Sequence, residues 1–126
     1  MACGTNVINV KGNLINNATY TDNTNVSGGI VLNGSAQQQI SGTGTFGLLK
    51  LDNVAGAVVN NNITLNENLV FTNGILDISK YLLSLGDHSV ITTSGAGFSS
   101  SKMVTSDGVW SNVGILKVFG PSSPSP

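Results

Sequence analysis

Short apolar pairs alternate with polar turns along most of this chain. In each pair two apolar residues flank one other residue, and this spacing puts both on the same face of a β-strand. Successive pairs begin about six to eight residues apart. The clearest ones are Leu49/Leu51, Ala57/Val59, Ile63/Leu65, Leu69/Phe71, Leu76/Ile78 and Leu83/Leu85, followed by Val90 with Ile91. The pattern predicts a succession of short strands.

Every third pair recurs after about twenty residues. The intervals are 20 from Leu49 to Leu69, 19 from Ala57 to Leu76, 20 from Ile63 to Leu83, 19 from Ile30 to Leu49 and 22 from Ile8 to Ile30. A loop of that length can close a three-sided cross-section and stack on the next loop, because paired strands lie about 4.8 Å apart. The sequence therefore predicts an all-β fold, a parallel β-helix with three short strands per turn, and we expect a right-handed coil.

Two other structures are compatible with parts of the pattern. Short strands joined by turns such as Asn33-Gly34 also fit an antiparallel meander. We favour the coil, because pairs this short make a weak hairpin sheet on their own. Residues 75–85 carry enough Leu and Lys to suggest a helix, but Gly74 and Gly86 flank a segment whose pairs have strand spacing.

The pattern of apolar and polar residues changes after residue 94. A chain of 126 residues suits one domain. We assign residues 1–94 to the β-solenoid coils and residues 95–120 to a final turn or to the start of a following module. Residues 121–126, PSSPSP, are predicted to be a linker or a disordered tail, because proline cannot donate to a strand ladder.

Charged residues are scarce. The chain has five Lys, no Arg, five Asp and one Glu, with a formal net charge of −1. The absence of a basic patch argues against a nucleic-acid partner. No apolar run reaches the roughly 18 residues of a membrane span. Polarity comes instead from Ser, Thr, Gly and sixteen Asn, and in a stacked coil Asn side chains at equivalent turns can bond one another.

No set of residues in the sequence forms a convincing catalytic, cofactor-binding or metal-binding site. His88 lacks a second His or a nearby thiol to make a metal site. Asp52, Asp77 and Asp87 are candidate acids for cleaving a glycosidic bond, which needs two carboxyl groups about 5–10 Å apart. The register places Asp77 outward on a strand and Asp52 at a turn on another face. We therefore predict a protein that is not an enzyme and has no cofactor.

Three other features have simpler structural interpretations. The glycine-rich run 42–47 lacks the Gly-Lys-Ser/Thr ending of a phosphate loop, so we interpret it as a turn. Tyr81 and Trp110 are candidates for stacking against a sugar, but they also suit packing. The lone Cys3 permits no intrachain disulfide. No signal peptide precedes it, and we expect the chain to be an excised piece of a longer protein.

Residues 38–86 carry a resemblance to a known group of proteins. The motifs GTGTF at 42–46, NNNIT at 60–64 and TNGILD at 72–77 resemble the Asn/Thr/Gly-rich repeat regions of large secreted surface proteins of Bacteroidota. The similarity extends over about residues 30–120 and includes residues 99–104 and 118–120. It implies a β-solenoid with an adhesin-like or scaffolding role outside the cell, often after export by the type IX system. It supplies no catalytic residue.

The sequence therefore favours a non-enzymatic structural or adhesive segment of an extracellular or cell-surface protein. Its expected partners are neighbouring repeats of a longer chain, a second copy stacked end to end into a fibre, or surface glycans. A carbohydrate-binding or carbohydrate-cleaving β-helix is the alternative. A flat face that binds ice is a less favoured hypothesis, because Thr43/Thr45 and Thr92/Thr93 do not form a regular column.

Overall fold

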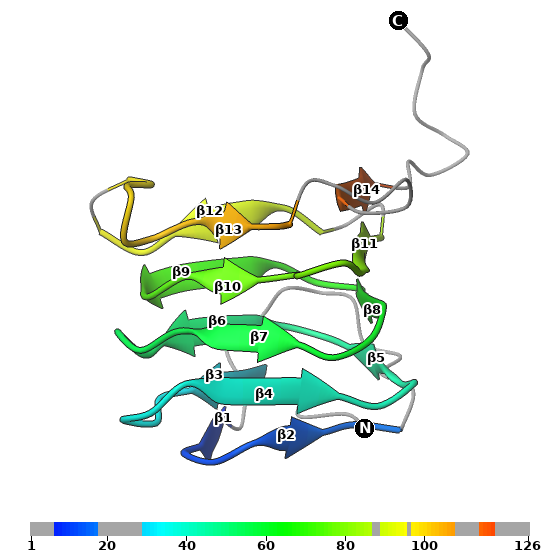
Figure 1. Cartoon of the computed structure of the whole chain (residues 1–126), viewed down its shortest axis with the longest axis horizontal. Coiled ribbons are helices and arrows are strands. Elements are labelled where there is room, and N and C mark those ends of the chain that lie inside the picture. The colour runs from blue at the N-terminus through cyan, green and yellow to red at the C-terminus, as the bar shows by residue number, and fades with distance from the viewer. Residues whose placement is uncertain (1–6, 18–28, 87–88, 96, 108–113, 118–126) are drawn as a thin grey trace, which may run out of the picture.

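The computed structural model of the chain is built from β-strands wound into a coil (Figure 1). It describes residues 7–17, 29–86, 89–95, 97–107 and 114–117. Three parallel sheets form the walls of the coil. The first sheet consists of β1 (Val7–Val10), β3 (Gly29–Leu32), β6 (Leu49–Asp52), β9 (Leu69–Asn73) and β12 (Ile91–Thr93).

The other two sheets complete the cross-section. The second sheet consists of β2 (Leu14–Ile15), β4 (Gln38–Ser41), β7 (Ala57–Val59), β10 (Leu76–Asp77) and β13 (Val104–Thr105). The third consists of β5 (Thr45–Phe46), β8 (Ile63–Leu65), β11 (Leu82–Leu85) and β14 (Gly114–Lys117). Each strand pairs only with strands from the preceding and following turns, which confirms the parallel β-helix and excludes the meander. The part of the chain that the structure describes contains no helix able to cross a membrane.

The pairing register is the one that the apolar intervals predict. The partners include Ile8↔Ile30, Ile30↔Leu49, Leu49↔Leu69, Leu76↔Ala57 and Leu83↔Ile63. In Figure 1 the chain runs rightward along the front sheet, passes the right-hand side and returns leftward at the back while it rises. This path is right-handed, as expected.

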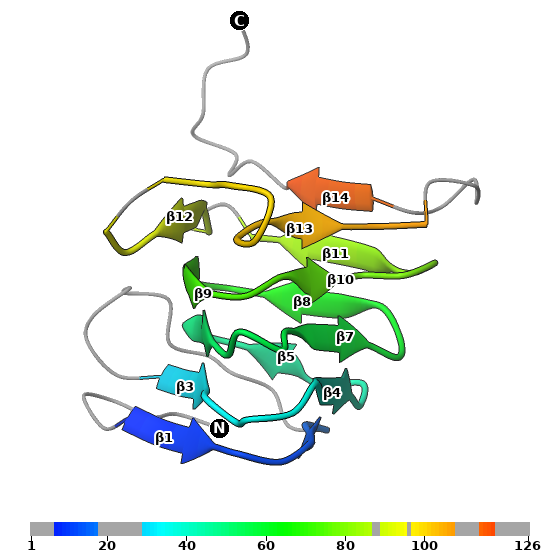
Figure 2. The same cartoon turned by 60° about the vertical axis from the view of Figure 1, so that its left-hand side comes forward.

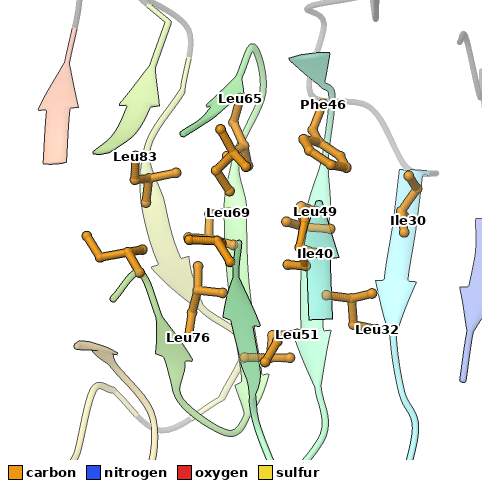
Figure 3. Packing of buried hydrophobic residues seen from close by; sticks show 14 of the residues in the cluster. Ile30, Leu32, Ile40, Phe46, Leu49, Leu51, Leu65, Leu69, Leu76 and Leu83 are labelled. Atoms are coloured by element: carbon orange, nitrogen blue, oxygen red, sulfur yellow. The ribbon is translucent and has the colours of Figure 1, made fainter. Parts of the chain in front are cut away.

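Inward-facing side chains fill the axis of the coil with an apolar core (Figure 3). Both members of every predicted pair from Leu49 to Leu85 are buried. The buried apolar residues also include Ile30, Leu32, Ile40 and Phe46. Each such side chain stabilises the fold by about 1.5–3 kcal/mol relative to its exposed state.

Two details of the predicted pattern are wrong. Val90 and Ile91 do not both face inward: Ile91 pairs with Leu69, whereas Val90 is largely exposed. Adjacent residues of a strand point to opposite faces, so Thr93 takes the second inward position. The strand β5 was not among the predicted pairs, because Phe46 is its single buried apolar residue.

The segment after residue 94 continues the sheets where it is described. β13 pairs with β10, and β14 pairs with β11. The proposed division at residue 94 stays a prediction. The Pro/Ser stretch 121–126 lies outside the described residues.

Candidate functional site

The N-terminal end of the coil presents apolar side chains that belong to the core columns. Ile8 is aligned with Ile30, yet 38% of Ile8 is exposed and only 4% of Ile30. The two residues differ in their position in the stack, because among the described strands β1 has a partner on one side and β3 has one on both. Val7 and Ile15 are also exposed at this end, but they are aligned with Gly29 and Ser41 and lie on the outer face of the coil. Among the described strands, β1 and β2 thus offer unpaired edges beside apolar surface.

At the opposite end, β12, β13 and β14 each have one partner within the described part of the chain. Val90, Phe98 and Ile115 are the large exposed apolar residues near this end. The two ends are complementary in principle. A parallel strand pairs along both edges in the same direction, so β1 and β2 of one molecule match the open edges of β12 and β13 of another.

A polar network lies inside the coil where the first sheet meets the second. The Gln38 side chain is buried, and its Nε2 donates to the carbonyl oxygens of Val10 at 2.8 Å and Gly12 at 2.6 Å. Its Oε1 accepts from the Gly34 amide and from Asn53 Nδ2, both at 2.9 Å. The Gln38 side chain is therefore hydrogen-bonded to residues of three successive turns.

Asn53 extends this network upward. Its Nδ2 also donates to the Ala36 carbonyl at 2.8 Å, and its Oδ1 accepts from the Ala55 amide at 2.9 Å. Buried polar groups of this kind contribute to stability only when each one has its partner. We assign this corner a structural role.

Gln38→Leu should lower the free energy of unfolding by about 2–3 kcal/mol, because it removes partners from several buried backbone groups. Urea denaturation followed by circular dichroism would measure the loss. Gln37→Leu is the matched control, since Gln37 is exposed and adjacent. Equal urea midpoints for the two variants would contradict a structural role for the network.

Asn side chains connect neighbouring turns along the outside. The predicted Asn–Asn contact is present between Asn33 Nδ2, which donates, and Asn9 Oδ1, at 3.0 Å. More often the Asn oxygen accepts from a backbone amide one turn later. Asn62 Oδ1 accepts from Leu82 at 2.8 Å, and Asn68 Oδ1 accepts from Val90 at 3.0 Å. Asn side chains therefore also bond the backbone of the next turn.

The acids considered from the sequence lie apart and have local partners. Asp52 ends β6 in the first sheet, and its Oδ1 accepts from Asn73 Nδ2 at 2.7 Å. Asp77 belongs to β10 in the second sheet, and its Oδ1 accepts from the Ser79 amide at 2.8 Å. The two carboxylates thus occupy different faces, as the spacing predicted. Asp87 and His88 lie outside the described residues.

No three His, Cys, Asp or Glu residues gather at a metal-binding distance in the described ranges. Glu67, which the sequence analysis did not single out, is buried between β8 and β9.

Tyr81, a candidate sugar-stacking residue, packs partly buried against the core, with Lys80 Nζ 5.9 Å from its ring centre. Trp110 and Cys3 lie outside the described residues. Carbohydrate binding stays a prediction.

On the outer face of the third sheet, Thr45 is aligned with Thr64, and Thr64 is aligned with Ser84 of the following turn.

Sequence reasoning missed the corner network. The sequence signal for this network is Gln38 at an inward pair position, where the next two turns have Ala57 and then Leu76.

Comparison of the chain with protein-family models, with curated proteins and with solved structures gave no match in any of the three.

Proposed function

We propose that this chain is a non-enzymatic structural segment of an extracellular or cell-surface protein, where it serves as a stalk or adhesive scaffold and stacks end to end. The observation that carries the proposal is the N-terminal edge. There, β1 is in register with the core columns, but its inward residue Ile8 is left partly exposed. Covering this edge with another turn would bury apolar surface and pair the open strand.

The rest of the molecule supports a role based on shape. Apolar side chains fill the axis, and the polar network at Gln38 connects neighbouring turns of the coil. Such a coil gains length turn by turn, because each turn contacts only its neighbours. The resemblance of residues 38–86 to repeat regions of secreted surface proteins supports a location outside the cell.

Stacking can be tested by light scattering on fractionated protein over a range of concentrations, with negative-stain electron microscopy of the same samples. A reducing agent removes any contribution from Cys3. We expect linear oligomers one coil wide at high concentration. Ile8→Lys should prevent them, because it places a charge on the open end.

Val54→Lys is the matched control for this experiment. Val54 is 87% exposed on the turn between β6 and β7, away from both ends. The Val54→Lys variant should associate like the unaltered protein. If Ile8→Lys and Val54→Lys gave the same oligomers, the N-terminal edge would not be the joint.

A further inference from the structure

The corner between the first and second sheets is much longer in the last described turn than in the others. Ten residues, 94–103, separate β12 from β13. The equivalent corners of the four preceding turns are residues 11–13, 33–37, 53–56 and 74–75, which is two to five residues each. The coil closes without the extra length, so the longer segment needs another explanation.

This segment is fixed at both of its ends. The Ser94 amide donates to the Phe71 carbonyl at 3.0 Å, and Ser94 Oγ lies 2.7 Å from Thr72 Oγ1. The Met103 carbonyl accepts from the Leu76 amide at 3.0 Å. Between these points the yellow segment linking β12 to β13 lies at the C-terminal end of the stack (Figure 2).

Phe98 connects the segment to the core. Its ring lies 6.0 Å from the ring of Phe71 in an edge-on arrangement, with an interplanar angle of 67°. Phe71 is fully buried, whereas Phe98 is 54% exposed. The residue aligned above Phe71 in the next turn is Thr93, which is short and polar. An aromatic ring beside it supplies the apolar cover that a longer inward side chain would otherwise provide.

Backbone bonds within the segment hold it folded near Phe98. Ser99 and Lys102 exchange two backbone hydrogen bonds, both 3.1 Å long. The Ser101 amide donates to Ser99 Oγ at 3.3 Å. The segment is thus a small folded turn next to an exposed aromatic residue.

We propose that residues 94–95 and 97–103 belong to an end cap, anchored by Phe98 on Phe71, that restrains a second copy of this chain from stacking on β12 and β13. The inference rests on the end-to-end stacking proposed above. The partner is the N-terminal edge of the second copy, because β1 and β2 carry the parallel edges and apolar residues that continue these two sheets. Stacking requires the end cap to move aside. Terminal turns with an altered outer face are a general device for ending repeat arrays.

Two variants test the end cap. Phe98→Ser removes the anchor. A short-corner variant replaces residues 94–103 with Thr-Asn-Gly-Ile, the sequence of residues 72–75. Thr93 is aligned with Phe71 and Val104 with Leu76, so this replacement reproduces the chain length of the preceding turn. Val54→Ser is the control, since it removes an exposed apolar side chain away from the ends.

Light scattering against concentration and hydrogen exchange of the β9 and β12 amides are measured on all four proteins. We expect both cap variants to associate at a concentration at least about tenfold lower than the unaltered chain. Their β9 and β12 amides, measured where the proteins are monomeric, should exchange faster. Val54→Ser should match the unaltered chain.

The other outcomes separate the two proposals. Equal association of all four proteins would overturn the end cap and leave stacking in place. Faster exchange without any association would overturn stacking, and with it the blocking role. Unchanged exchange and no association would overturn both. If the short-corner variant fails to fold, the association and exchange of Phe98→Ser alone test the end cap. Failure of both variants to fold would contradict a cap that can move aside.

Discussion

Leu69→Asp or Leu83→Asp abolishes folding, whereas Thr64→Asp leaves the coil intact. Both leucines are fully buried in the axis of the coil. Leu69 lies between the aligned residues Leu49 and Ile91. Aspartate at either position loses the apolar contacts of leucine, worth about 2–5 kcal/mol, and adds a buried charge without a partner. The total stability of a domain is only about 5–15 kcal/mol.

Thr64 provides the matched comparison on the same stretch of sheet. It points outward between Thr45 and Ser84, both of which carry neutral hydroxyl groups. Aspartate there stays in contact with water, so the loss should be below about 1 kcal/mol. Thermal melts followed by circular dichroism would compare the three variants. Similar losses at positions 64, 69 and 83 would contradict the assigned inward and outward faces.

Gly74→Ala is expected to cost at least about 3 kcal/mol. Gly74 has a φ of +102°, in the left-handed region that side chains disfavour, and an added Cβ would overlap the carbonyl oxygen of Asn53. The clash cannot be relieved locally, because the Asn53 amide donates to the Asn73 carbonyl at 3.1 Å. Two successive turns of the coil would have to separate at this corner.

Gly12→Ala is the control for this change. An added Cβ at Gly12 meets no atom within 4 Å. The Gly12 carbonyl that accepts from Gln38 belongs to the backbone and is preserved. Chemical denaturation of both variants would measure the difference in unfolding free energy. A Gly74→Ala protein as stable as Gly12→Ala would show that the turns are less tightly stacked than the structure indicates.

The apolar intervals were sufficient to predict the register. Leu49, Leu69 and their equivalents are aligned as the spacing of about twenty residues predicts, because each turn must return its apolar residues to the inner face of the sheet. The intervals were least informative where a turn has a single inward apolar residue, as at Phe46, or where Thr93 replaces one.

Contacts between distant residues could not be read from local patterns. The bonds of Gln38 reach 26 and 28 residues back to the first turn and 15 residues forward to Asn53. The contact of Phe98 with Phe71 likewise depends on a segment that has no apolar periodicity. For the candidate site, the sequence indicated that a second copy could stack end to end, but not which residues are exposed at the ends of the described coil.

The sequence by itself determined the parallel coil and its core, because strand spacing and repeat length are local properties that burial converts directly into register. Only the tertiary structure decided how far each inward residue is buried and which distant side chains meet, as Phe98 and Phe71 do. Ile8 and Ile30 have the same chemistry and the same inward position, yet one is exposed and the other buried. Among the described strands, β3 lies between two partners and β1 beside one, and no residue encodes that difference alone.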